Sequence, residues 1–521
     1  MPAKNYRSLK KLFSRIPVEV LSEVPAVFIN GIALDSRQVK PGNIFIALAG
    51  ELTDGHKYIP QAVQNGAVAV LGERADVHPA VPYIQVKGDP KHAMAYLAAA
   101  LHDFPARKLT VIGVTGTDGK TTTTTMIHQI LTRAGVKAGM ISTVSAVIGS
   151  EELDTGFHVT TPESPAIQAY LAQMVEAGMT HVVLETTSHG LVQERVTACD
   201  YDLGVLTNVT HEHLDFHGSY ENYLEAKGRL FEMLKQTPKK RAGNLRSAIL
   251  NKDDRSYGYL KRVAPADQVS YSMVNEGDIW ADGIENTPEE LRFTCHYGTQ
   301  AVKVSTQMTG LYNVSNALAA IAATVLRLGV PIEIAVEALA VMPGVPGRME
   351  RINLGQAFTA IVDFAHTPNA LQRALETVKE LTRGRVIAVF GSAGLRDREK
   401  RRMMPKVSIE NADLTIMTAE DPRTESLDEI LAEMAASAVE AGGIEGRNFW
   451  RVPDRGEAIR LACQVAQAGD LVIACGKGHE QSMCFGTTEF LWDDRTAMRA
   501  ALAEKMGKVG PAMPYLPTRN G

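Results

Sequence analysis

A predicted strand, a glycine turn and a helix within residues 109–134 constrain the fold of this chain more than any other feature. Residues 109–114 are mostly apolar, the turn reads Thr-Gly-Thr-Asp-Gly-Lys-Thr-Thr, and the pattern predicts a helix over 121–134. This is the layout of a phosphate-binding loop, in which glycines let backbone N–H groups surround an oxyanion at a helix N-terminus. We therefore expect an α/β domain that binds a nucleotide phosphate.

The loop is a shortened variant of the common motif, because Gly116 precedes Gly119 by only three positions. Lys120 is placed to reach the β- and γ-phosphates, and the Thr121 hydroxyl to hold Mg²⁺. The alternative is a glycine turn that only caps a helix. The apolar strand before the turn argues against that alternative.

Composition limits the classes of protein that need to be considered. The chain has 521 residues, too many for one ordinary core, and a formal net charge of -5, which gives no basic surface for nucleic acid. No apolar run approaches the roughly 18 residues of a membrane span. The five cysteines form no C-x-x-C pair, which argues against structural zinc and fits a reducing compartment, so we expect a cytoplasmic location.

The order of predicted elements indicates three α/β domains, at residues 1–107, 108–342 and 343–521. The Pro-Gly-Val-Pro-Gly run at 343–347 is typical of a linker. Beyond it, short apolar strands alternate with helical stretches, which predicts a second doubly wound sheet. The tail after Gly507 is rich in proline and is expected to be frayed.

Polar clusters follow two apolar strands of the middle third. Glu185 comes directly after the strand at 182–184, and the run His-Glu-His-Leu-Asp-Phe-His at 211–217 follows the strand at 203–206. Ligands collect at the carboxyl ends of parallel strands, so Glu185 is well placed to bind Mg²⁺ beside the phosphate loop. A helix cap or a polar surface would explain the same residues, while the histidine spacing does not fit a zinc protease.

Taken together, these motifs resemble the Mur ligase superfamily. The resemblance extends over all three expected domains and rests on T-G-T-D-G-K-T-T, E-T-T-S-H-G-L at 185–191, N-V-T-H-E-H-L-D at 208–215, G-L-Y-N-V-S-N-A at 310–317, D-F-A-H-T-P at 363–368 and G-K-G-H-E at 476–480. It implies an N-terminal UDP-binding domain, a central ATP-binding domain with a parallel sheet, and a C-terminal Rossmann-like domain.

The resemblance implies an ATP-dependent amide ligase of peptidoglycan synthesis. Its expected substrates are ATP, UDP-N-acetylmuramoyl-L-Ala-D-Glu and a diamino acid, joined through an acyl phosphate by a monomer. Related alternatives are ligases for alanine, D-glutamate or D-Ala-D-Ala and ligases of the folylpolyglutamate or cyanophycin type. An alternative from another class is a catalytically silent nucleotide-binding scaffold, and the retained Lys120, Glu185 and Lys227 argue against it.

The resemblance also assigns residues to roles. Those matched to ATP are Gly116, Thr117, Asp118, Gly119, Lys120, Thr121, Thr122, Asn313, Arg348 and His366. Those matched to two Mg²⁺ ions are Thr121, Glu185, His213 and Lys227, the last as a CO₂-derived carbamate. The catalytic set is Lys120, Lys227, Glu185, His213 and Asn208. Those matched to the UDP-muramoyl-dipeptide are Leu34, Ser36, Glu51, Leu52, Thr53, Thr160, Thr161, Thr187, Ser188, Gln193 and Arg195.

The residues matched to the incoming amino acid are Arg396, Glu420, Asp421, Pro422, Arg423, Gly476 and Glu480. The sequence departs here from the Asp-Asn-Pro-Arg tetrad of meso-diaminopimelate enzymes, since residues 420–423 read Glu-Asp-Pro-Arg. Arg423 can grip a carboxylate, whereas the charge of Asp421 disfavours a nearby carboxylate and favours an ammonium. Meso-diaminopimelate is favoured because of Arg423, and L-lysine and L-ornithine stay open.

Overall fold

The computed structural model describes residues 6–50, 54–153, 161–210, 214–241, 243–274, 276–287 and 290–520. The chain divides into two compact units. The first contains Met1–Gly283, Phe293–Val304 and Tyr312–Ala340, and the second contains Ile284–Arg292, Ser305–Leu311 and Val341–Gly521. Within the described ranges, no helix has both the length and the apolar character needed to cross a bilayer.

A small parallel sheet opens the first unit. Its strand order is β3 (Gly31–Ala33), β4 (Asn43–Ile46), β5 (Ala69–Gly72) and β6 (Tyr83–Gln85). Side chains alternate across a strand, so the two faces of β4 have separate cores. Ile44 and Ile46 pack with α1 (Leu9–Phe13) and α3 (Pro90–Leu101), and Phe45 packs with α2 (Ile59–Gln64). A two-stranded sheet of β1 (Arg7–Ser8) and β2 (Phe28–Ile29) lies outside this sheet.

The large sheet of the first unit is mixed, with eleven strands among the described residues. In spatial order they are β10 (Glu151–Leu153), β9 (Ala146–Ile148), β8 (Ala138–Ile141), β11 (His181–Glu185), β7 (Thr110–Thr115), β12 (Leu203–Leu206), β13 (Ser247–Asn251), β14 (Asp267–Ser272), β15 (Ile279–Asn286), β16 (Leu291–Tyr297) and β17 (Gln300–Thr306). Strands β8, β11, β7, β12, β13 and β14 are parallel, so their carboxyl ends share one edge. Strand β9 pairs antiparallel with both β8 and β10, so the expected parallel sheet forms the centre of a larger mixed sheet.

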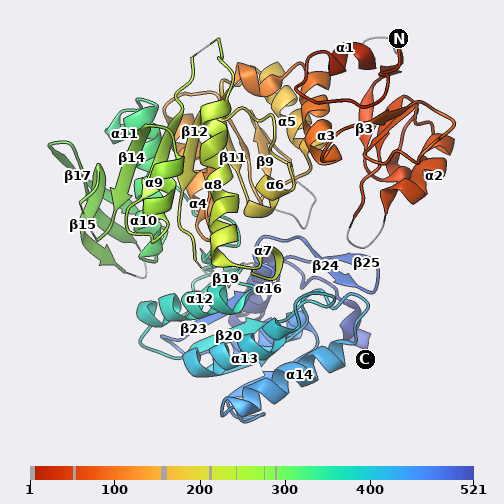
Figure 1. The fold of residues 1–521 in the computed structure, drawn as a ribbon. Coiled ribbons are helices and arrows are strands. Elements are labelled where there is room, and N and C mark those ends of the chain that lie inside the picture. Colours follow the sequence, from red (N-terminus) through yellow and green to blue (C-terminus); the bar gives the residue numbers. More distant parts are fainter. Residues whose placement is uncertain are drawn as a thin grey trace. The chain divides into compact units, whose positions relative to one another are not determined.

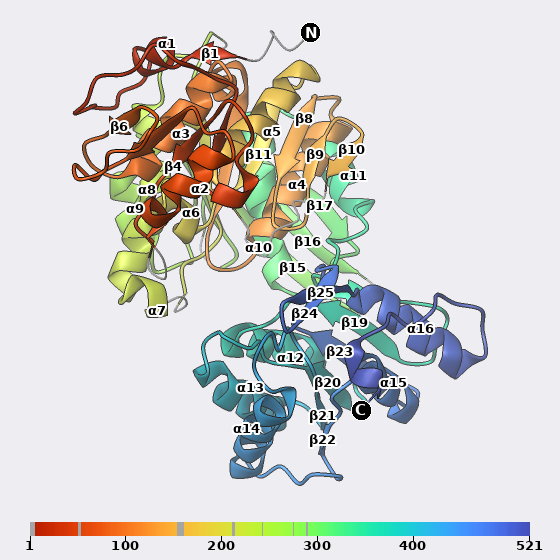
Figure 2. The same ribbon diagram turned by 90° about the vertical axis from the view of Figure 1, so that its right-hand side faces the viewer.

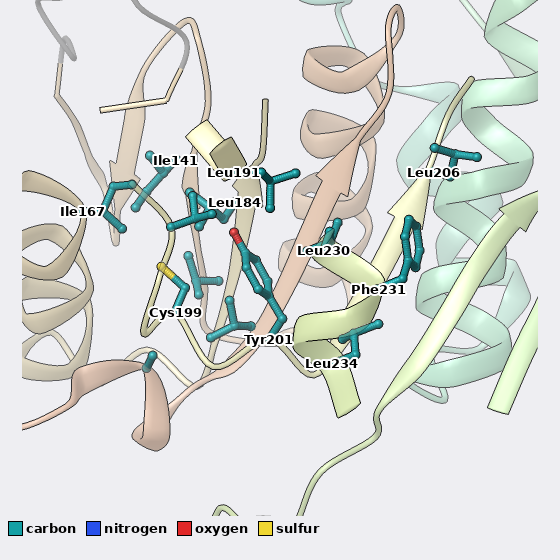
Figure 3. Packing of buried hydrophobic residues seen from close by; sticks show 14 of the residues in the cluster. Ile141, Ile167, Leu184, Leu191, Cys199, Tyr201, Leu206, Leu230, Phe231 and Leu234 are labelled. Carbon is teal, nitrogen blue, oxygen red and sulfur yellow. The ribbon is translucent and has the colours of Figure 1, made fainter. Parts of the chain in front are cut away.

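Helices cover both faces of this sheet. One face packs against α5 (Ser164–Glu176), α8 (Tyr220–Gln236) and α9 (Tyr257–Val263), and α8 and α9 lie on the near side in Figure 1. Figure 3 shows this core, in which Tyr201 and Leu184 meet Leu230 of α8. Helix α4 (Lys120–Arg133) contacts β7, β8 and β11 and packs with α10 (Tyr312–Ile321) and α11 (Ile332–Ala340). Between α10 and α11 the chain forms a π-helical segment, Ala322–Arg327.

The second unit contains a six-stranded sheet. Its order is β18 (Glu350–Arg351), β19 (Thr359–Asp363), β23 (Leu471–Cys475), β20 (Val386–Phe390), β21 (Leu414–Met417) and β22 (Phe449–Arg451). All pairs except β18–β19 are parallel. Figure 2 shows α12 (Pro368–Leu381), α13 (Glu399–Asn411) and α14 (Leu427–Glu440) on one face, with α15 (Arg455–Val465) and α16 (Asp494–Met506) on the other. A hairpin of β24 (Ser482–Phe485) and β25 (Thr488–Leu491) precedes α16.

The expected α/β fold class is confirmed, and the predicted strands of the second sheet correspond to β19, β20, β21 and β23. The expectation of a frayed tail is wrong. Met513 and Leu516 are buried in the core that β19, β23, α15 and α16 share. The apolar residues between the prolines anchor the tail to this core, a contact that the proline content does not reveal.

A fully buried ion pair ties α15 to α16. The Arg455 guanidinium donates to both oxygens of Asp494, at 2.7 and 2.6 Å, and both side chains have no exposed surface. Trp492 Nε1 also donates to Asp494, at 2.8 Å. Removing one member of such a pair leaves an uncompensated buried charge, so Asp494→Asn should lower the free energy of unfolding by about 3–5 kcal/mol. Urea unfolding of this variant beside Asp493→Asn, whose side chain is partly exposed, measures the difference, and equal stabilities would contradict the expectation.

Candidate active site

The phosphate loop lies between β7 and α4, at the edge where the parallel strands end. Two of its positions require glycine. Gly116 has φ 152°, and an added Cβ would lie 1.8 Å from Thr207 Oγ1; Gly119 has φ 78°, and its Cβ would lie 2.3 Å from Asn316 Oδ1. Because these neighbours come from β12's end and from α10, the glycines let two other segments approach the loop closely.

The side chains at the start of α4 fit the predicted phosphate and metal contacts. Thr121 Oγ1 donates to Glu185 Oε1 at 3.0 Å, and both side chains are buried. The other carboxylate oxygen of Glu185 accepts from the Thr143 backbone N–H at 2.9 Å. Lys120 Nζ donates to the Thr117 carbonyl at 2.7 Å, so it lies over its own loop. The structure thus brings the lysine and hydroxyl of the phosphate loop next to the Glu185 carboxylate, which belongs to a separate motif.

A buried lysine approaches the loop from α8. Lys227 Nζ donates to the Gly116 carbonyl at 2.6 Å and lies 4.2 Å from the centre of the Tyr223 ring. Only 1% of Lys227 is exposed. Lysine on a helix is usually a solvated surface residue, and this burial against the loop distinguishes Lys227 from the other lysines of α8.

The segment after β12 supports the loop backbone. Asn208 Oδ1 accepts from Asp118 N at 3.0 Å, and its Nδ2 donates to Asp118 O at 3.2 Å. Thr207 Oγ1 donates to the same carbonyl at 2.6 Å. On the other side, Asn313 accepts from Asn316, which packs against Gly119. Asn208 therefore contacts the loop directly, and Asn313 is connected to it through Asn316.

The residues matched to the muramoyl-dipeptide form a hydrogen-bonded group beside β11. Thr161 Oγ1 lies 3.0 Å from Thr187 Oγ1, and Thr187 caps α6 (Ser188–Val192) by accepting from Gly190 N. Arg195 Nη1 donates to Thr161 O at 2.8 Å, and its Nη2 lies 2.9 Å from Glu163. The buried Nε of Arg195 makes no hydrogen bond within the described residues.

The remaining expected residues of the first unit are only partly described. Ser36 is buried, and its hydroxyl donates to Gln61 Oε1 at 2.7 Å, with Leu34 half-buried nearby in sequence. Ser188 lies 3.0 Å from His217 Nε2, Gln193 follows the end of α6, and Thr122 is buried in the first turn of α4. The expected residues outside the described ranges are Glu51, Leu52, Thr53, Thr160 and His213.

In the second unit, an imidazole-rich cluster lies at the end of β19. Arg348 stacks over Phe364 at 4.5 Å from the ring centre, and Phe364 also contacts the rings of His366 and His479. Burial, with nearby Lys400, lowers the pKa of His366 to about 4, and burial with Arg348 lowers the pKa of His479 to about 3. Both imidazoles are therefore neutral at pH 7, where a neutral ring can still form hydrogen bonds to a nucleotide.

Six of the seven residues matched to the amino acid follow the ends of β21 and β23. Glu420 is buried against Gly476, where an added Cβ would lie 2.3 Å from Glu420 Oε2. Burial raises the pKa of Glu420 to about 7, although Arg455 and Lys477 oppose this rise. Arg423 has φ 53°, and its Nη1 donates to the Gly394 carbonyl at 2.6 Å. Pro422 is buried between Asp421 and Arg423 in the sequence. Arg396 is exposed on the loop before α13.

Sequence reasoning missed Lys477, although it lies inside the G-K-G-H-E motif. Its ammonium donates to Asp421 Oδ1 at 3.0 Å and lies 2.5 Å from Glu480 Oε2. Asp421 was expected to present an unbalanced negative charge, and the structure instead pairs that charge with Lys477. The sequence shows only a lysine between two glycines directly after an apolar strand, and this does not reveal the partners of Lys477.

The fold and the first of these clusters define a class of protein. A phosphate loop at the ends of parallel strands, with a buried threonine–carboxylate pair beside it, is the nucleotide site of a P-loop enzyme. Comparisons with known proteins narrow the class. Residues 28–107 match the Mur ligase family catalytic domain, 114–324 the Mur ligase middle domain, and 347–478 the Mur ligase glutamate ligase domain.

Whole-chain relatives agree with these domain matches. The UDP-N-acetylmuramyl-tripeptide synthetase of Roseiflexus sp. (strain RS-1) is 43% identical over 91% of this chain and 95% of its own length. The UDP-N-acetylmuramoyl-L-alanyl-D-glutamate–2,6-diaminopimelate ligase of Geobacillus thermodenitrificans is 41% identical over 95% of this chain and 99% of its own. The chain belongs to the Mur ligase family and is an ATP-dependent ligase.

Solved structures show the same fold. A UDP-N-acetylmuramoyl-L-alanyl-D-glutamate–2,6-diaminopimelate ligase superposes with a TM-score of 0.65 at 30% identity, covering 96% of this chain and 99% of that one. The MurF ligase from Thermotoga maritima, solved in complex with ADP, has a TM-score of 0.60 at 19% identity, covering 92% and 98%. The second likeness concerns the fold alone.

Proposed function

We propose that this ligase joins a diamino acid, meso-diaminopimelate, to the D-glutamate of UDP-N-acetylmuramoyl-L-Ala-D-Glu. The observation that carries the proposal is the pairing of Thr121 with Glu185 at the phosphate loop, beside the Thr161–Thr187–Arg195 group. The diaminopimelate ligases among the relatives, at 37–41% identity, support the choice of substrates. Their names describe those proteins, and the transfer of their substrates to this chain is the proposal.

The buried oxygens at the loop fit a magnesium ion. Mg²⁺ prefers hard oxygen ligands, and the Thr121 hydroxyl and Glu185 carboxylate lie 3.0 Å apart where a β,γ-phosphate would meet α4. Mg²⁺ bound there would neutralise charge on the transferring phosphoryl group. His213, a proposed ligand of a second ion, lies outside the described residues.

Lys227 is proposed to carry a carbamate. In this reaction the neutral amine attacks the carbon of CO₂, an N–C bond forms, and the amine's proton leaves to solvent. The reference pKa of lysine is near 10.4, so the reaction needs a site that can release the ammonium proton. The resulting oxygens would join Thr121 and Glu185 as metal ligands.

The chain's residues then account for two chemical steps. The D-glutamate γ-carboxylate attacks the γ-phosphorus of ATP, ADP leaves, and an acyl phosphate forms. The amine of the diamino acid attacks the acyl carbon and phosphate leaves. Lys120 and the loop N–H groups would hold the phosphates, and the Arg195 guanidinium would provide positive charge for a substrate carboxylate.

The distal carboxylate of meso-diaminopimelate is the proposed partner of Arg423. This arginine is 21% exposed in its side chain and presents a planar fork that matches a carboxylate. Arg423→Ala should lower kcat/KM for meso-diaminopimelate. The expected loss of transition-state binding free energy is about 2–5 kcal/mol, as for loss of a buried charge partner. Steady-state kinetics with Arg402→Ala, an exposed arginine of α13, as control test this. An Arg423→Ala variant with wild-type kcat/KM would exclude the contact.

A nucleotide-dependence assay tests the function directly. Purified protein is incubated with ATP, Mg²⁺ and meso-diaminopimelate, with and without UDP-N-acetylmuramoyl-L-Ala-D-Glu, and phosphate release is measured. Release should require the UDP-dipeptide. Phosphate release that does not depend on the UDP-dipeptide would contradict the proposal. No phosphate release in any mixture would also contradict it and would favour the silent-scaffold alternative.

A further inference from the structure

Lys477 is a buried charge among the residues of the second unit that are proposed to bind the amino acid. It follows β23 in the loop that also carries Gly476 and Glu480, and its side chain has no exposed surface. A lysine is rarely buried so completely unless it is paired. Its partners are Asp421 at 3.0 Å and Glu480 at 2.5 Å, and these two carboxylates belong to segments 59 positions apart.

The pairing holds Asp421 and Lys477 in their charged forms. Burial alone would raise the pKa of Asp421, but Lys477 and the Cys484 backbone N–H, at 2.9 Å, hold that pKa below its usual range. Burial alone would lower the pKa of Lys477, and Glu480 with Asp421 raises it instead. The Lys477 ammonium thus lies between the Asp421 and Glu480 carboxylates and offsets their negative charge.

The balance of charge affects Arg423 next to it. Arg423 Nη2 lies 3.9 Å from Asp421 Oδ2, longer than the distance from Lys477 to the other oxygen of the same carboxylate. The ammonium therefore holds Asp421 more closely than the guanidinium does. Without Lys477, Asp421 and Glu480 would attract Arg423, repel an incoming carboxylate and favour a side chain that ends in an ammonium.

We propose that Lys477 is a specificity-determining positioning residue, which keeps Arg423 available to a distal carboxylate by neutralising Asp421 and Glu480. The site thereby selects an amino acid with a distal carboxylate over one that ends in an ammonium alone. This inference rests on the proposed function. It assigns the selectivity to a residue that does not itself touch the substrate.

The test compares kcat/KM for meso-diaminopimelate and for L-lysine in wild type and Lys477→Met. Wild type should favour meso-diaminopimelate. In Lys477→Met, use of meso-diaminopimelate should fall by about 100-fold or more and use of lysine should fall less or rise, so that the ratio drops by at least about 10-fold. Lys406→Met, an exposed lysine of α13, is the matched control and should keep the wild-type ratio.

A further variant separates selectivity from folding. In Lys477→Met/Asp421→Asn/Glu480→Gln all three charges are removed together, and the ratio should recover towards wild type. If Lys477→Met does not fold, Asp421→Asn alone decides, because it leaves the lysine's charge in excess and should raise the ratio. If the role of Lys477 is purely structural, Lys477→Met should lower kcat/KM for both amino acids by the same factor.

The outcomes distinguish this inference from the function beneath it. If wild type makes no tripeptide from either amino acid, the proposed function fails. If it makes the tripeptide but the ratio is the same in Lys477→Met, or does not rise in Asp421→Asn, only the role of Lys477 is wrong. Wild type that prefers L-lysine would also overturn the inference.

Discussion

Ligation should fall by about 10³-fold or more in Lys120→Ala. The lysine begins α4, and its ammonium now donates to the Thr117 carbonyl, 2.7 Å away, within the loop that receives the phosphates. Charge builds on the β- and γ-phosphate oxygens during transfer, and a fixed cation there stabilises the transition state more than the bound ATP. The loss should therefore appear in kcat as well as in KM for ATP, which initial-rate measurements resolve.

The control for this variant is Lys137→Ala, an exposed lysine just beyond the end of α4. It should keep wild-type rates. Thermal unfolding should be similar for both variants, because the Lys120 side chain is only partly buried. Near wild-type ligation by Lys120→Ala would reject the assignment of residues 116–122 to the nucleotide phosphates.

Lys227→Ala should lose most activity, by about 10²-fold or more, and formate or acetate should restore part of it. The substitution removes the group that lies 2.6 Å from the Gly116 carbonyl and leaves space behind the loop. If the wild-type residue acts as a carbamate, a small carboxylate can supply the missing oxygen ligand in that space. Rates measured across a series of formate and acetate concentrations should rise and saturate.

Lys235→Ala on the same helix provides the comparison, since Lys235 is exposed. It should be fully active and insensitive to formate. A fully active Lys227→Ala would disprove a role in catalysis. An inactive Lys227→Ala that no carboxylate rescues would argue that the ammonium itself, through Gly116, is the required form.

Much of the first unit's site could be predicted because its parts are local. The strand–turn–helix at residues 109–134 encodes the loop in adjacent positions, and Glu185 follows its own strand directly. The parallel order β11–β7–β12 then brings Glu185, the loop and Asn208 to one edge. Sequence patterns predict such sites well, because the topology of parallel sheets gathers strand ends without further information.

The charge balance of the second unit could not be predicted in the same way. Taken alone, Asp421 is an extra negative charge that should repel a carboxylate. Its true effect depends on Lys477, which is 56 positions away, and on the close approach of the segments that carry them. The buried tail around Leu516 is a similar case, because its contacts form only when α15 and α16 are in place. Long-range packing determines both the Asp421–Lys477 pairing and the burial of Leu516, and no local sequence pattern predicts such packing.

A competition between the three diamino acids tests directly which of them the ligase adds. The protein is incubated with ATP, Mg²⁺, UDP-N-acetylmuramoyl-L-Ala-D-Glu and an equimolar mixture of meso-diaminopimelate, L-lysine and L-ornithine, and the UDP-linked products are weighed by mass spectrometry. If the ligase adds meso-diaminopimelate, one main product is expected: the dipeptide nucleotide extended by meso-diaminopimelate, formed together with ADP and phosphate. A main product that contains lysine or ornithine, or recovery of the unextended nucleotide, would contradict it.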